Sequence, residues 1–128
     1  MRYGYWMPIF GGWLRNVRDE GMPVAWPYLA SLATESERHG FDLSLIAELN
    51  LNDIKGHRAP SLDCWTLAPA VAAVTRTLEL MLAVRPNYHS PALTAKALSA
   101  RRHRSGPDIA ERGLVLVEGR GEPVRRPL

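Results

Sequence analysis

The stretch Leu78–Val84 (LELMLAV) decides the fold class. It is an apolar run interrupted only by Glu79, which is typical of a strand buried on both faces of a parallel sheet. Ser90 and Pro91 follow, an N-cap residue and a proline suited to the first helical position, so we expect a helix over Ala92–Ala100. A buried strand followed by a helix makes one βα unit.

Two more units are expected before it. Arg2–Ile9 (RYGYWMPI) is aromatic-rich and predicts a first strand. The segment Pro27–His39 carries an apolar stripe at helical spacing, and Gly40 is placed to cap its C-terminus. Phe41–Ala47 (FDLSLIA) then predicts a second strand.

A second helix is expected to be capped by Ser61 and to run to about Thr75, with a kink at Pro69. The order strand, helix, repeated along the chain favours an α/β fold with parallel strands and crossover helices. Two architectures fit this order, an open doubly wound sheet and a (β/α)8 barrel. Since no G-x-G-x-x-G follows the first strand, the dinucleotide-binding form of the open sheet is disfavoured.

Barrels place their chemistry in the loops that follow the carboxyl ends of the strands. In this chain those loops are Phe10–Met22, Glu48–Pro60 and Arg85–His89. The second has no apolar periodicity, and a loop of that length is commonly functional. The sequence therefore directs the search for a site to these three segments.

Composition and charge are those of an ordinary globular domain, with 46% hydrophobic and 23% charged residues in 128. The net charge of +3 arises in one part of the chain. Residues 1–100 carry nine Lys or Arg against nine Asp or Glu, whereas residues 101–128 carry seven Arg against four acidic residues. A nucleic-acid-binding role would thus rest on the tail alone, and we rank it last.

The sequence contains no apolar run long enough to cross a membrane and no secretory signal. Its one cysteine, Cys64, has no internal partner for a disulfide, and the four histidines form no metal-ligand spacing with it. A cytoplasmic protein without a metal site is the expectation.

Four segments resemble the luciferase-like flavin monooxygenases, and among them most of all the reduced-FMN-dependent alkanesulfonate and dimethyl-sulfone monooxygenases. These segments are YWMPIFGGW (5–13), GFDLSLIAE (40–48), APSLDCW (59–65) and VTRTLELMLAVRPNYHSPALTAKALSA (74–100). The last is the most specific, since it joins a buried strand ending in A-V-R-P to S-P-A-x-x-A-K.

The resemblance implies a (β/α)8 TIM barrel of which residues 1–100 supply the first three βα units. It implies a monooxygenase that uses O2 and reduced FMN, supplied by a partner flavin reductase, to oxygenate a small organosulfur or similar substrate. Full-length members are expected to be homo-oligomers. Because so much of the barrel is missing, we expect the chain as given to be inactive; the alternative is a non-catalytic truncated product or interaction module.

The resemblance also suggests site residues, although the catalytic residue stays unknown. It places Glu48 and Leu49 against the flavin, with Leu49 standing where relatives often carry a basic residue. Ser61 lies where sulfonate-type relatives carry a cysteine, and we assign it to the substrate side without that cysteine's role.

Three further residues are assigned to the substrate side from the barrel rule. Phe10 offers an aromatic wall. The guanidinium of Arg85 suits a sulfonate or phosphate, with a salt bridge to a neighbouring carboxylate as the equal alternative. His89 lies within reach of the same opening of the barrel, where it could contact the substrate. The alternative is a loop histidine that is exposed to solvent and has no such role.

The tail, residues 101–128, is predicted to be an irregular Arg-, Gly- and Pro-rich segment outside the fold, although its apolar run Leu114–Val117 is suited to add to a sheet edge. The genetic code suggests its origin. Read one nucleotide later, degenerate codons for Glu111–Val124 permit N-V-V-S-S-W-W-K-A-E-E-N-R-Y, the continuation that the resemblance implies. The hypothesis is a shifted reading frame, and resequencing the coding DNA near codon 100 tests it.

Overall fold

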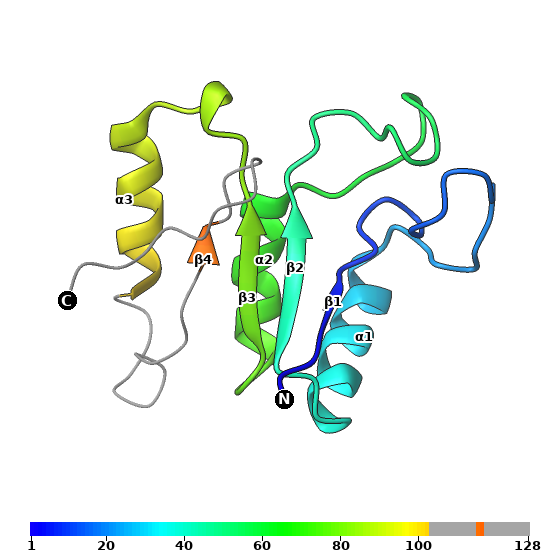
Figure 1. The fold of residues 1–128 in the computed structure, drawn as a ribbon, viewed down its shortest axis with the longest axis horizontal. Coiled ribbons are helices and arrows are strands. Elements are labelled where there is room, and N and C mark those ends of the chain that lie inside the picture. Colours follow the sequence, from blue (N-terminus) through cyan, green and yellow to red (C-terminus); the bar gives the residue numbers. More distant parts are fainter. Residues whose placement is uncertain (103–114, 117–128) are drawn as a thin grey trace.

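The computed structural model describes residues 1–102 and 115–116. Strands and helices alternate, as the sequence predicted, and the three βα units are all present (Figure 1). The elements are β1 (Gly4–Trp6), α1 (Trp26–Arg38), β2 (Leu43–Ala47), α2 (Cys64–Val74), β3 (Glu79–Ala83), the 3-10 turn η1 (Pro86–Tyr88), α3 (Pro91–Arg102) and β4 (Val115–Leu116).

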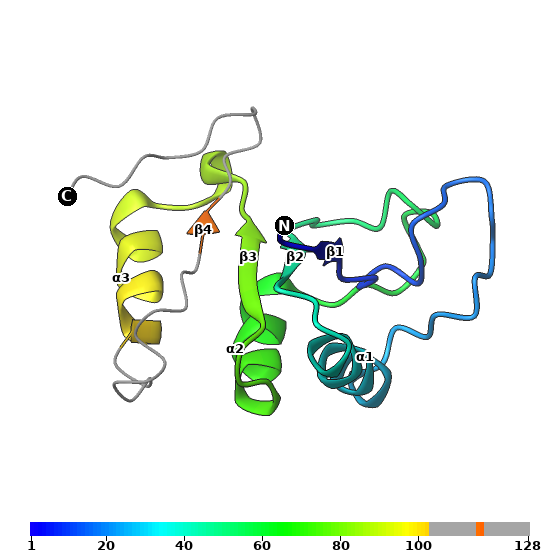
Figure 2. The same cartoon turned by 60° about the horizontal axis from the view of Figure 1, so that its bottom comes forward.

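The strands form one open parallel sheet in the order β1-β2-β3-β4. Helices α1 and α2 lie side by side against one face, as Figures 1 and 2 show. The register pairs Tyr5 with Ser44 and Ser44 with Leu80. Tyr5 points to the helix face, because its hydroxyl lies 2.9 Å from Ser36 Oγ on α1. The core is therefore built between the sheet and these two helices.

The opposite face of the sheet carries the other row of side chains. There Trp6 pairs with Leu45 and Leu45 with Met81. Leu45 and Met81 are half-buried and Trp6 is 51% exposed, whereas Ile46 and Leu82 on the helix face are fully buried. One face covered by helices and one apolar face left partly open is the arrangement of three βα units taken from a (β/α)8 barrel.

The predicted cap of the second helix was wrong. Asp63, not Ser61, is the N-cap, and its carboxylate accepts a hydrogen bond of 2.9 Å from Thr66 N. Ser61 stays outside the helix because the next residue, Leu62, donates its backbone N–H to Ile9 O at 3.1 Å. The helix continues through Pro69 without ending.

The C-terminal helix and strand were predicted less completely than the earlier elements. Helix α3 runs to Arg102, past the expected limit at Ala100. Val115–Leu116 pairs with β3 as a parallel strand, which confirms the expectation that this apolar run adds to the open edge. The other expectations for residues 101–128 fall outside the described residues. In the described part no helix is long and apolar enough to cross a membrane.

One half-buried carboxylate, that of Glu37, fastens α1 to the start of β3. Glu37 accepts hydrogen bonds from Arg76 N (2.8 Å), Leu78 N (2.7 Å), Thr77 Oγ1 (2.8 Å) and Thr77 N. Burial alone would raise the pKa of Glu37, but these donors outweigh it and hold the pKa below its ordinary value. The ionised side chain thus sets where β3 enters the sheet.

The substitution Glu37→Gln is expected to lower the free energy of unfolding by about 1–3 kcal/mol, since an amide offers one acceptor oxygen to several donors. Urea unfolding followed by circular dichroism at pH 7 measures the change. The control is Glu35→Gln on the same helix, which removes an exposed pair with Arg38 and is expected to cost less than about 1 kcal/mol. Equal losses in the two variants would remove the role assigned to Glu37.

Candidate functional site

The carboxyl ends of β1, β2 and β3 lie at one edge of the sheet, and the three long connections leave from that edge (Figure 1). This follows from the parallel order, because each strand must return through a helix to start again at the opposite edge. The segments that the sequence singled out are therefore neighbours. The polar side chains at this edge form two clusters.

The first cluster is built around Glu48, the residue that follows β2. Its carboxylate accepts hydrogen bonds from Arg85 N (2.5 Å), Trp65 Nε1 (2.8 Å) and His89 Nε2 (2.5 Å). Its backbone is also engaged, since the N–H donates to Ala83 O and the carbonyl accepts from Arg85 Nε. One side chain thus joins the ends of β2 and β3, helix α2 and the turn before α3.

This carboxylate is held in its ionised form. The side chain of Glu48 is only 6% exposed, and burial by itself would raise its pKa. The hydrogen bonds from Arg85 N, Trp65 and His89, together with the charge of His89 when protonated, outweigh burial, so the pKa of Glu48 lies below its ordinary value. A buried anion with three donors is a fixed acceptor around which the other groups are arranged.

His89 is fixed on two sides. Its Nε2 faces Glu48, and its ring makes an edge contact with Trp65, with centroids 5.2 Å apart and planes at 66°. The side chain remains 29% exposed, so the ring is reachable from solvent at the carboxyl edge. It is neither a freely solvated loop histidine nor a core residue.

Arg85 lies beside it on the exposed side of the cluster. Its Nε donates to the backbone carbonyl of Glu48 at 3.2 Å. Among the ion pairs that join two described residues none involves Arg85. The guanidinium is anchored through Nε and carries its charge at the site edge.

The remaining candidates take different places. Phe10 is buried at 6% exposure in the main core, and Leu49 is half-buried against that core. Ser61 is half-buried in the segment before α2. The structure brings Glu48, Arg85 and His89 into contact, whereas among the described residues no hydrogen bond or ion pair joins Phe10 or Ser61 to that cluster. Sequence reasoning missed Trp65, although it closes the quoted motif APSLDCW.

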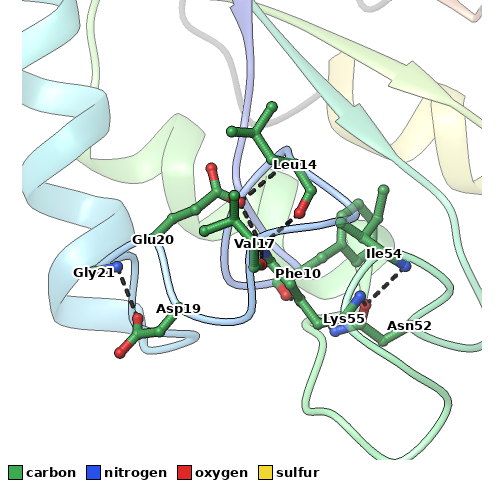
Figure 3. A network of polar contacts seen from close by, with 9 residues as sticks. All are labelled: Phe10, Leu14, Val17, Asp19, Glu20, Gly21, Asn52, Ile54 and Lys55. Carbon is green, nitrogen blue, oxygen red and sulfur yellow. Dashed lines mark hydrogen bonds and ion pairs between the residues drawn. The ribbon is translucent and has the colours of Figure 1, made fainter.

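The second cluster fastens the first loop to the second (Figure 3). Lys55 Nζ donates to Leu14 O (2.8 Å), to Val17 O (2.5 Å) and to the carboxylate of Glu20. The side chains of Lys55 and Glu20 are 7% and 9% exposed. All three donors of the ammonium are used, so this buried charge is fully paired. We call Lys55, Glu20 and the two carbonyls the loop clamp.

Asn52 also joins the first loop to the second. Its Nδ2 donates to Phe10 O (3.0 Å) and Pro60 O (2.7 Å), and its Oδ1 accepts from Lys55 N (2.8 Å) and Ile54 N (3.2 Å). The side chain is 1% exposed, and all its hydrogen-bonding groups in these contacts are satisfied. Asn52 thus holds the backbone of Phe10 as well as that of its own loop.

Three of the described residues could hold part of a flavin. Leu49 and Trp65 give half-buried apolar surface beside the cationic Arg85, which suits an aromatic ring system with polar edges. The glycine pair Gly11-Gly12 follows β1. A Cβ added at Gly12 would overlap the carboxylate of Glu20, so that side chain already occupies the space where a phosphate would approach Gly12.

Two comparisons with known proteins bear on this site. The family model of the luciferase-like monooxygenases matches residues 1–103. The FMNH2-dependent dimethylsulfone monooxygenase of Pseudomonas putida is 30% identical over 113 residues, which is 86% of this chain. The chain spans about 30% of the length of that relative.

Proposed function

The chain belongs to the luciferase-like monooxygenase family, and on this premise we propose that it is the first part of a monooxygenase that uses reduced FMN and O2 to oxygenate a small organosulfur compound. The observation that carries the proposal is the cluster of Glu48, Trp65, Arg85 and His89 at the carboxyl edge of the sheet. Barrel enzymes build their active sites at this edge. A flavin reductase would supply the reduced FMN.

Each candidate residue has a place in this proposal. Leu49 would give apolar contact to the flavin ring, and Glu48 would act beside it mainly by holding its neighbours, because its polar atoms already have partners. Arg85 would attract the negative oxygens of a sulfonate-like or sulfone substrate, while His89 would contact the substrate from the same side. Phe10 and Ser61 would border the substrate from the first loop and from the segment before α2.

When bound, reduced FMN supplies the electrons that activate O2, and the protein binds, orients and shields the reactants. The partners proposed are therefore the substrate, O2 and the reductase, with homo-oligomers for full-length relatives and a cytoplasmic location. Residues 1–100 are proposed to form the barrel segment, and residues 101–128 to come from a shifted reading frame.

A chimera tests the proposed function. Residues 1–102 would replace the matching N-terminal segment of the P. putida dimethylsulfone monooxygenase, and substrate-dependent oxygenation would be assayed with FMN, NADH and a flavin reductase. We expect turnover by the chimera, and neither turnover nor tight FMN quenching by the 128-residue chain. The control is the chimera with Arg85→Gln, expected to raise KM about tenfold or more through loss of a charged contact. A folded, flavin-binding chimera without turnover would overturn the proposal.

A further inference from the structure

We propose that His89 and Glu48 form a proton-transfer dyad, in which Glu48 is the positioning residue and His89 Nδ1 is the group that takes up and returns a proton. The inference deepens the proposed function and rests on it, because the monooxygenase reaction identifies the oxygen atom to which His89 passes the proton. Monooxygenation places one oxygen atom of O2 in the substrate and releases the other as water, so protons must move within the site. The geometry supplies a group suited to that task.

Glu48 sets the tautomer of the His89 imidazole. His89 Nε2 lies 2.5 Å from Glu48 Oε1, and the same carboxylate accepts from Trp65 Nε1 and Arg85 N. A carboxylate surrounded by donors is an acceptor only, so the neutral ring must carry its hydrogen on Nε2. Nδ1 is then left with its lone pair, and in the described residues no hydrogen bond engages it.

The orientation of the His89 ring is fixed as well. The edge contact with Trp65 and the bond to Glu48 fix the plane of the ring, while 29% exposure keeps it open toward the carboxyl edge. The charged groups beside it are Glu48 at the end of β2 and Arg85 at the end of β3. A proton taken up at Nδ1 from solvent makes an imidazolium whose charge Glu48 balances, and transfer of that proton to the oxygen atom that leaves as water would restore the neutral ring.

The tautomer can be measured on the full 128-residue chain without flavin. Long-range 15N–1H spectra of 15N-histidine-labelled protein at a pH where the ring is neutral distinguish the two forms, and His89→Gln identifies the signal. We expect the Nε2–H form in the wild type and a mixture in Glu48→Gln, whose amide can donate as well as accept. The control is Glu35→Gln. The carboxylate of Glu35 lies 3.9 Å from His39 Nε2, so this variant should alter the signals of His39 only. An Nδ1–H form in the wild type would overturn the dyad.

The chemical role of His89 is measured in the chimera of residues 1–102 with the P. putida enzyme. His89→Gln keeps an N–H donor toward Glu48 but cannot take up a proton, so we expect kcat to fall by about 100-fold, with a flatter pH profile and KM changed by less than about threefold. An unaltered kcat and pH profile would overturn the dyad and leave the monooxygenase proposal standing. Failure of the parent chimera would count against the proposed function alone, because the tautomer is measured independently of turnover.

Discussion

Replacing Lys55 with methionine is expected to free the first loop, Phe10–Met22, from the second. Lys55 Nζ holds two carbonyls of that loop, Leu14 O and Val17 O, and pairs with Glu20 in the same loop. Methionine has a similar length but no donor, so the carbonyls lose their partner and the carboxylate of Glu20 is left without its cation. The clamp (Figure 3) joins the two loops together with the bonds from Arg15 to Asp53 and from Asn52 to Phe10 O.

Limited trypsin digestion followed by mass spectrometry measures the release. The bonds after Arg15 and Arg18 lie in the first loop, and we expect their cleavage to be about tenfold faster in Lys55→Met, because a local loss of about 1.4 kcal/mol raises the open population by that factor. Arg58→Gln, an exposed change in the second loop, serves as the matched control. Equal cleavage rates in all three proteins would mean that the clamp does not hold the loop.

A double variant separates the effect of the ion pair from the effect of the carbonyl contacts of Lys55. In the double variant Glu20→Leu with Lys55→Met, no uncompensated charge remains, so protection of the loop should return in part. If the double variant is cleaved as fast as Lys55→Met, the carbonyl contacts of Lys55 rather than its ion pair hold the loop.

The strands and helices could be predicted because their signals are local. The apolar run of β3 and the stripe of α1 reflect burial on particular faces, and Gly40 has the positive φ of 83° that favours glycine after a helix. The start of α2 could not be decided locally, since Ser61 and Asp63 are both good N-cap residues. The contact of Leu62 N with Ile9 O, far away in the sequence, settles the choice.

The candidate site was predicted in part for the same reason. Strand ends and the barrel rule direct attention to Glu48, Arg85 and His89, and these do meet. Their grouping around one carboxylate could not be foreseen, because the bond between Glu48 and His89 spans 41 residues of sequence. The clamp of Lys55 on Glu20 spans 35 residues and leaves no pattern within either loop.

Removal of the Glu48 carboxylate is expected to have the largest effect on stability. Glu48→Ala leaves Trp65 Nε1, Arg85 N and His89 Nε2 without their acceptor. Each buried donor left unpaired costs about 1–3 kcal/mol, so even with water replacing some of the bonds we expect a loss of more than about 2 kcal/mol. Urea unfolding at pH 7, followed by tryptophan fluorescence, measures it. The control is Asp53→Ala, which breaks an exposed pair with Arg15 and should cost less than about 1 kcal/mol.

The same comparison has a definite pH dependence. Because the pKa of Glu48 is lowered in the folded protein, the unfolded chain binds a proton there at higher pH, and acid favours unfolding. The contribution of Glu48 is therefore fully present above the ordinary carboxyl pKa of 4.5 and is lost as the pH falls through the lower, folded value. The pKa values of Glu20 and Asp53 are lowered too, chiefly by hydrogen bonds from Lys55 and Arg15.

Those two carboxylates are present in both the wild type and Glu48→Ala, so their effects cancel in the difference between the two proteins. The stability gap should narrow as the pH falls below 4.5. A gap that stays the same down to the acid unfolding of the wild type would show that the pKa of Glu48 is the same in the folded and the unfolded protein. In that case the hydrogen bonds from Trp65, Arg85 and His89 would not favour the ionised carboxylate, and Glu48 could not act as the acceptor that orders these residues.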